Sequence, residues 1–176
     1  ISTSETVSAL GATAVFCDVN EFFLIDTEIL RRKITSRTVG IIPVHLFGQV
    51  ADMKDIVSIA QEYSLWVLED CAQAHLATQH GRAAGSFGIA ASYSFYPGKN
   101  LGAMGDAGAI TTNDFNLSKT FKRIANHGSL FKGEHKLEGI NSRMDGIQAS
   151  ILNVKLPHLV KWTDRRREVA SAYSAA

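Results

Sequence analysis

The sequence predicts an α/β fold, a mostly parallel β-sheet with helices on both faces. Short apolar runs typical of strands alternate along the chain with stretches whose apolar residues recur at helical spacing. This alternation is typical of parallel sheets, because each crossover helix lies against a face of the sheet. The composition agrees: of 176 residues, 45% are hydrophobic and 20% charged, as in an average globular protein.

Several short segments are expected to form strands. They are residues 14–19, 39–44, 65–68, 89–95 and 108–112. The second, with the sequence VGIIPV, is almost continuously apolar, as expected of a strand that is covered on both faces. Ligands of parallel sheets gather at the carboxyl ends of the strands. Asp70 and Lys99, which come shortly after apolar runs, are therefore the first candidates for function.

Helices are expected between these strands and after them. They are residues 26–33, a segment that begins at Asp52, residues 114–126 and residues 144–172. Asp26 suits the start of the first helix, because its side chain can accept hydrogen bonds from free backbone N–H groups. In the second helix, one face is expected to hold Ile56, Val57, Ala60 and Tyr63. Pro157 is expected to interrupt the last helix.

Charge and cysteine content exclude several classes of protein. The formal net charge is +1, so no nucleic acid is expected as a partner. The two cysteines form no CxxC pair, which favours a reducing, cytoplasmic location. No apolar run approaches the ~18 residues that span a bilayer, so no membrane association is expected. Because the chain opens on Ile1 without a methionine and stops inside a helical pattern, we expect a fragment.

The turn Tyr96-Pro97-Gly98-Lys99 follows the fourth predicted strand. A lysine is a nucleophile only when desolvation or a neighbouring charge helps it to lose its proton. Pro97 and Gly98 would fix the backbone and let a ligand approach closely. The turn is not a phosphate-binding P-loop, because Asn100 stands where that motif needs Ser or Thr. An ordinary surface loop remains the alternative from this segment alone.

Asp70 belongs to the acidic pair Glu69-Asp70 at the end of the third predicted strand, where a carboxylate can hold a protonated ring nitrogen or a metal ion. Gln73 follows it and can point the same way if the chain begins a turn. An aspartate that caps a helix is the alternative. No metal site is expected, because His75 and His80 are not completed to a recognised ligand spacing. No Ser-His-Asp order supports acyl transfer either.

Together, Asp70 and Lys99 suit the chemistry of pyridoxal 5′-phosphate (PLP). This cofactor needs a lysine that holds it as a Schiff base and a carboxylate that keeps its pyridine nitrogen protonated. Strand–loop–strand geometry would bring both groups to one rim of the sheet.

Four motifs, in order, carry a resemblance to a known family. They are VHLFGQ (44–49), EDCAQA (69–74), SFYPGKNLG (94–102), and GINSR (139–143) with QA (148–149). The chain resembles the DegT/DnrJ/EryC1/StrS family, which comprises PLP-dependent sugar-nucleotide aminotransferases of fold type I. The resemblance implies that residues 1–156 belong to the PLP-binding large domain, incomplete at its N-terminal side. Residues 157–176 would begin the helix that leads to the small C-terminal domain.

The resemblance also implies roles for individual residues. Lys99 would bind the cofactor covalently and move the proton between the substrate carbon and the cofactor. Asp70 would pair with the pyridine nitrogen, and Gln73 would lie against the ring. Ser94 would donate a hydrogen bond to the phosphate. Asn141 would reach the phosphate of the neighbouring subunit, so that a homodimer shares its active sites.

The reaction implied is transfer of an amino group, usually from glutamate, to a keto group of a nucleotide-linked sugar. Pyridoxamine phosphate would carry the amine between the two halves of the reaction. The sequence around Lys99 is most similar to that of members acting on 3-keto sugars. This resemblance implies a role in amino-sugar biosynthesis for surface polysaccharides or secondary metabolites. A related branch of dehydratases carries histidine at the lysine position, so Lys99 favours transamination.

Two alternatives stay open beside this reading. One is a truncated, non-catalytic remnant that only folds or dimerises. The other is a PLP lyase or dehydratase of the same fold. The family's phosphate-binding helix start and its ring-stacking aromatic residue would precede Ile1, so we expect the piece alone to be weakly active at best.

Overall fold

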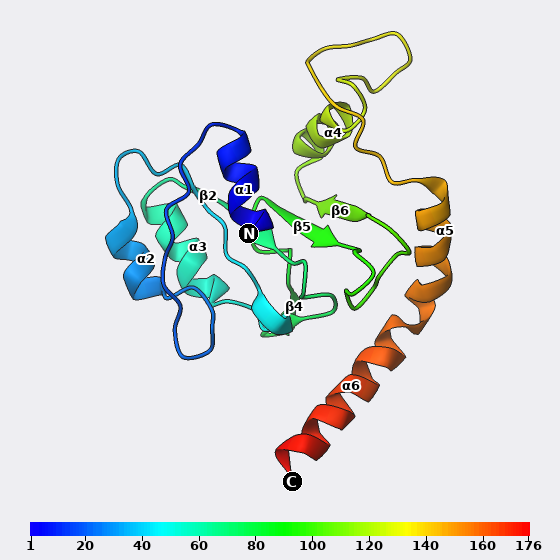
Figure 1. Cartoon of the computed structure of the whole chain (residues 1–176). Helices are drawn as coiled ribbons and strands as arrows, with labels where there is room; N and C mark the ends of the chain where they lie inside the picture. The colour runs from blue at the N-terminus through cyan, green and yellow to red at the C-terminus, as the bar shows by residue number, and fades with distance from the viewer. The chain divides into compact units, whose positions relative to one another are not determined.

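The structure, a computed structural model, describes all 176 residues, and its chain divides into two compact units. The first unit contains residues 1–93 and 110–115. The second contains residues 94–109 and 116–176. Figure 1 follows the chain by colour from its N-terminus to its C-terminus. None of the helices combines the length and the apolar composition needed to cross a membrane.

The main sheet has four strands in the order β1-β2-β5-β6. They are β1 (Gly40–Ile41), β2 (Trp66–Asp70), β5 (Ala90–Ser94) and β6 (Gly108–Thr111). The ladders β1–β2 and β2–β5 are parallel, whereas Figure 1 draws β6 in the direction opposite to β5. A separate antiparallel pair consists of β3 (Thr78–Gln79) and β4 (Arg82–Ala83). The predicted α/β class with a mostly parallel sheet is confirmed.

Three α-helices belong to the first unit: α1 (Ser2–Ala9), α2 (Thr27–Lys33) and α3 (Met53–Glu62). As predicted, Asp26 caps α2, and its Oδ1 accepts hydrogen bonds from two backbone N–H groups at 2.8 and 3.0 Å. Asp52 caps α3 in the same way, at 3.3 Å. The buried face of α3 consists of Met53, Ile56, Ile59 and Ala60. This corrects the predicted face, because Tyr63 follows the helix and is 41% exposed.

The core of the first unit lies around β2 and α3. Two of its fully buried members, Met53 and Ile56, come from α3, and Val67 comes from β2. Loop residues complete it, among them Ala51, Cys71 and Ala74. This packing fixes the carboxyl end of β2, where the EDCAQA motif (69–74) begins.

The second unit is mainly helical. Its elements are most of α4 (Phe115–Ile124), α5 (Gly146–Lys155), the 3₁₀ turn η2 (Leu156–His158) and α6 (Leu159–Ser174). The predicted interruption at Pro157 is confirmed, because this proline lies in η2 between the two helices. A small core joins Leu101 and Ala103 of the loop after β5 to Leu152 and Leu159 of the helices.

Two predictions of local structure were wrong. Residues 14–19 form no strand, only an isolated antiparallel bridge between Val19 and Ile25, and Phe16 is 75% exposed. A strand needs a neighbour for its backbone groups, and this apolar segment has no ladder partner. Residues 39–44 form only the short strand β1 and a bridge between Val44 and Asp70. The helix α1 was missed because no apolar face marks it: none of its residues is buried.

Candidate active site

Asp70 is the last residue of β2, as the sequence predicted, and two backbone hydrogen bonds to the neighbouring segment hold its main chain. Its N–H donates to the carbonyl oxygen of Pro43 at 2.9 Å, and its own carbonyl accepts from the N–H of His45 at 3.0 Å. The side chain is half-buried. Oδ1 accepts from the N–H of Ala72 at 3.0 Å, and Oδ2 accepts from Oγ1 of Thr3 at 2.7 Å. The structure therefore presents an oriented carboxylate at the end of a central strand.

Gln73 lies on the loop just beyond β2. Its Oε1 accepts a hydrogen bond of 2.7 Å from the backbone N–H of Phe47, in the 3₁₀ turn η1 (Leu46–Gly48). Phe47 has a positive φ of 57°, a conformation that non-glycine residues adopt rarely. Gly48 is needed where it stands, because its φ is +85° and an added Cβ would lie 3.3 Å from the carbonyl oxygen of Gln73. The turn thus fixes Gln73 by its oxygen.

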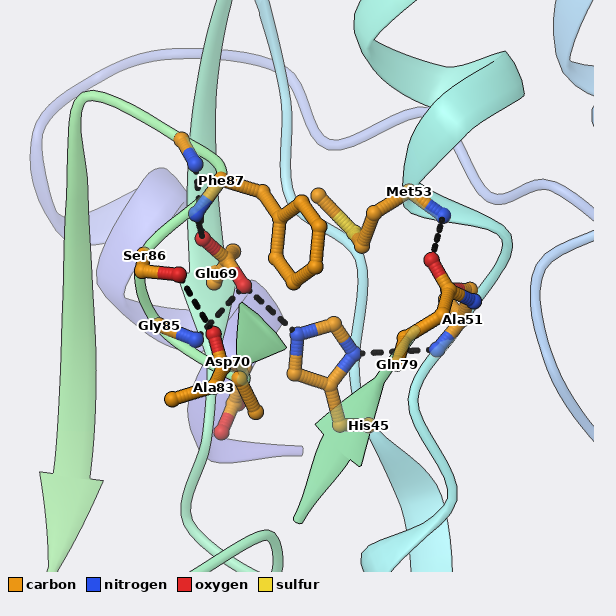
Figure 2. A network of polar contacts seen from close by, with 12 residues as sticks. His45, Ala51, Met53, Glu69, Asp70, Gln79, Ala83, Gly85, Ser86 and Phe87 are labelled. Atoms are coloured by element: carbon orange, nitrogen blue, oxygen red, sulfur yellow. Dashed lines mark hydrogen bonds and ion pairs between the residues drawn. The ribbon is translucent and has the colours of Figure 1, made fainter. Parts of the chain in front are cut away.

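Beneath Asp70 lies a buried polar network around Glu69, shown in Figure 2. Glu69 is 0% exposed and accepts a hydrogen bond of 2.9 Å from Nε2 of His45. Its other donors are the backbone N–H groups of Gly85, Phe87 and Gly88, at 2.7, 2.6 and 2.6 Å. Nδ1 of His45 accepts from the N–H of Ala51 at 3.2 Å. The ring proton of a neutral His45 is therefore on Nε2, where it faces the carboxylate.

The electrostatics of Glu69 follow from these donors. Burial alone would raise the pKa of the Glu69 carboxyl, but the hydrogen bonds from His45 and three backbone N–H groups outweigh it and hold this pKa below its usual value. The donors also argue against a metal centre, although the ligand atoms of His45, Glu69 and Cys71 lie within 4.8 Å of one another. Burial, with the charge of Glu69, raises the pKa of the Cys71 thiol to about 12, which keeps it protonated. The cluster is a hydrogen-bonded support.

Ser94 and Lys99 belong to the second unit. Ser94 is the last residue of β5, and its Oγ accepts from the N–H of Tyr96 at 3.3 Å, which leaves its own proton free to be donated. Lys99 is half-buried in the turn that follows, and its backbone N–H donates to the carbonyl oxygen of Tyr96 at 2.8 Å. Its ammonium has no hydrogen-bond or ion-pair partner within the second unit. An unpaired lysine amine is available to bind a carbonyl compound.

Helices α5 and α6 hold the loop that carries Lys99. Three side chains bond to it: Gln148 to the N–H of Met104 at 2.9 Å, Lys155 to the carbonyl of Gly102 at 2.6 Å, and Arg166 to the amide oxygen of Asn100 at 3.1 Å. Gly102 itself tolerates no side chain, since an added Cβ would overlap the carbonyl group of Pro97. Sequence reasoning missed these contacts, because nothing in the helical pattern marks which polar side chain meets the loop.

Asn141 lies in the second unit, where the chain forms an isolated bridge with Asn126. Its side chain is exposed, and its Oδ1 accepts from Nε of Arg143 at 2.9 Å. It makes no hydrogen bond to Ser94 or Lys99. The predicted residues thus divide between the units, with Asp70 and Gln73 in the first. Within the first unit, β2 and β5 are parallel, and Asp70 is in register with Ser92.

The comparison with known proteins decides the family. The model of the DegT/DnrJ/EryC1/StrS aminotransferase family matches residues 1–176. The chain belongs to this family. The recognition made from the four sequence motifs is therefore confirmed, together with the fold. Aminotransferases of this family depend on PLP.

Curated relatives of this family member include named sugar transaminases. It is 45% identical over 175 residues to the UDP-N-acetyl-3-dehydro-alpha-D-glucosamine 3-aminotransferase of Acidithiobacillus ferrooxidans, covering 99% of this chain and 47% of that protein. It is 50% identical over 169 residues to the dTDP-3-amino-3,6-dideoxy-alpha-D-galactopyranose transaminase of Aneurinibacillus thermoaerophilus, covering 95% and 46%. The chain spans about half the length of the curated relatives it matches.

Solved structures of the family share the fold. DesV of S. venezuelae, in complex with a ketimine intermediate, matches with a TM-score of 0.95 and 41% identity, over 98% of this chain and 47% of that one. NtdA of Bacillus subtilis, with the bound cofactor PMP, matches with a TM-score of 0.79 and 37% identity, over 86% and 35%. The residues present here fit such a cofactor, because the chain offers an oriented carboxylate at Asp70 and an unpaired amine at Lys99.

Proposed function

We propose that the protein is a PLP-dependent aminotransferase that transfers an amino group from glutamate to a keto group of a nucleotide-linked sugar. The 3-keto position is favoured, because the relatives described above are named for 3-amino products or a 3-dehydro substrate. The observation that carries the proposal is the pair of groups that PLP chemistry needs, Asp70 with two donors on its carboxylate and Lys99 with its unpaired ammonium. Amino-sugar biosynthesis is the corresponding pathway class.

Each residue near the proposed cofactor has a separate task. Bound PLP supplies an electron sink when a bond at the amino-bearing carbon breaks. Asp70 places its negative charge against the pyridine nitrogen and keeps that nitrogen protonated. Lys99 would hold the cofactor through its carbonyl carbon, and the Lys99 amine would move the proton between the amino-bearing carbon of the substrate and that cofactor carbon. Gln73, held by its oxygen, lies along the ring.

Ser94 and Asn141 are proposed to bind the phosphate. The free proton of Ser94 supplies one hydrogen bond. The exposed amide of Asn141 has its oxygen engaged by Arg143, which leaves its NH₂ group to donate. We assign that donation to the phosphate of the neighbouring subunit in a homodimer. The division into a large domain over 1–156 and a connecting helix from 157, and the cytoplasmic location, stay predictions.

The proposed reaction is tested by tracing the nitrogen of glutamate into the product. The full-length protein is incubated with PLP, ¹⁵N-glutamate and a panel of UDP- and dTDP-linked 3-keto and 4-keto sugars, and products are analysed by mass spectrometry. We expect ¹⁵N in a 3-amino sugar from the wild type and from Lys132→Ala, an exposed lysine that serves as the matched control. We expect none from Lys99→Ala. A dehydrated product without ¹⁵N would establish the lyase alternative, and unchanged turnover in Lys99→Ala would refute the assignment of Lys99.

A further inference from the structure

Helix α1 reaches the sheet through one long-range side-chain hydrogen bond. Thr3, in its first turn, donates from Oγ1 to Oδ2 of Asp70 at 2.7 Å. The hydroxyls of Ser4, Thr6 and Ser8 donate instead to carbonyl oxygens of the helix itself or of its cap residue. No residue of α1 is buried. Packing of an apolar face therefore does not account for the position of Thr3 at Asp70.

The bond from Thr3 completes the set of donors that defines the plane of the Asp70 carboxylate. Ala72 holds Oδ1 through its backbone N–H at 3.0 Å, and Thr3 holds Oδ2. With the first donor alone, the group could turn about its Cβ–Cγ bond and leave Oδ2 undirected. With one donor on each oxygen the plane is set, and each oxygen keeps a second lone pair for a further donor. Bonds to an ionised acceptor are also among the stronger ones.

We propose that Thr3 is a positioning residue for the cofactor: its hydroxyl holds the Asp70 carboxylate in the orientation that receives the ring N–H of PLP. The inference rests on the proposed function, because Thr3 acts only through Asp70. Without the hydroxyl, the carboxylate turns away for part of the time. The cofactor then binds more weakly, and its ring nitrogen is protonated for a smaller fraction of the time.

Three variants separate the hydroxyl from the shape of the side chain. Thr3→Val keeps the shape and removes the donor, and Thr3→Ser keeps the donor and removes the methyl group. Thr6→Val makes the same change as the first on the same helix, where the hydroxyl bonds only to the carbonyl oxygen of Thr3 at 3.0 Å. The PLP dissociation constant is measured by absorbance titration of the cofactor-free full-length protein. A second readout is the ¹⁵N shift of ring-labelled PLP, which distinguishes a protonated from an unprotonated pyridine.

Thr3→Val should raise the dissociation constant about tenfold, the effect of losing one bond to a charged acceptor. The ¹⁵N shift of PLP bound to this variant should move towards the value of an unprotonated pyridine. Thr3→Ser and Thr6→Val should stay within about twofold of the wild type in binding, as surface substitutions do. Wild-type binding in Thr3→Val overturns the inference. Equal losses in Thr3→Val and Thr3→Ser also overturn it, because the variant that keeps the hydroxyl donor would then bind PLP as weakly as the variant that lacks it.

A double-mutant cycle distinguishes failure of this inference from failure of the proposed function. If Asp70→Asn binds PLP like the wild type, the proposed function is wrong. If Asp70→Asn weakens binding, Thr3→Val should cause no further loss in that background, because two residues that act through one contact are not additive. A further full loss there would show that Thr3 acts independently of Asp70, and the inference alone would fail.

Discussion

The buried carboxylate of Glu69 gives the sharpest prediction for the fold around the site. Glu69→Gln keeps the size of the side chain and removes its charge. Each carboxylate oxygen accepts two hydrogen bonds, Oε1 from Phe87 and Gly88, and Oε2 from His45 and Gly85. All four partners are donors in the tautomer that the structure assigns. An amide NH₂ in place of either oxygen cannot accept, so two donors lose their partner whichever way the glutamine turns.

The expected cost follows from these two lost bonds. Hydrogen bonds to charged groups contribute about 1.5–3 kcal/mol each, so Glu69→Gln should lower the free energy of unfolding by about 3–6 kcal/mol. That is a large part of the ~5–15 kcal/mol that stabilises a typical domain. The matched control is Glu62→Gln, which breaks the ion pair between Arg31 and Glu62. The side chains of these residues are 41% and 51% exposed, respectively. Such exposed pairs contribute at most about 1 kcal/mol.

Urea unfolding followed by circular dichroism measures both variants against the wild type. If Glu69→Gln lowers the free energy of unfolding as little as Glu62→Gln does, the prediction is wrong, because the buried donors would then have found other acceptors. The pH dependence supplies a second check. Since the pKa of Glu69 is lowered from its ordinary 4.5, its contribution is present above that pH and is lost as the pH falls through the folded-state value. The difference in the free energy of unfolding between the wild type and Glu69→Gln should therefore become smaller in acid.

Two further predictions concern the loop that carries the proposed catalytic lysine. Lys155→Met removes the 2.6 Å hydrogen bond to the carbonyl oxygen of Gly102. It should lower kcat about tenfold with little change in KM, because the amine of Lys99 is then less well placed. Steady-state kinetics measure both constants, and an unchanged kcat would contradict the prediction. Gly102→Ala should reduce both turnover and thermal stability, because its Cβ overlaps a backbone carbonyl. Gly146→Ala should lower neither, because no atom lies within 4 Å of an added Cβ and alanine is a good helix former.

Patterns of local chemistry were enough to predict much of the fold. The cap of α2 followed from Asp26, and the start of α3 followed from Asp52; both side chains bond within the first turns of their helices. The break at Pro157 followed from the missing N–H of proline. The strand expected over 14–19 did not form, because a strand depends on a partner elsewhere in the chain, and apolar alternation says nothing of that partner.

The candidate site was predictable only in part, for the same reason. Asp70 and Lys99 stood out because the ends of strands are where ligands gather. Gln73 was a candidate because it follows Asp70, and the family motifs added Ser94 and Asn141. The structure confirms that Asp70 ends its strand, and it shows that β5 ends at Ser94, one residue before the predicted end. Their roles toward the cofactor remain proposals. The partners that orient these residues came only from the fold: Thr3 bonds to Asp70 across 67 positions of sequence, and Lys155 reaches Gly102 across 53.

In the proposed active site, Lys99 binds PLP covalently while Asp70 holds the pyridine ring. Borohydride reduction of the full-length protein with PLP, followed by peptide mass mapping, tests this arrangement most directly, because reduction makes the bond between lysine and cofactor permanent. We expect one major adduct, on Lys99, and its loss or marked weakening in Asp70→Ala. Adducts scattered over surface lysines, or a single adduct on another lysine, would contradict the account.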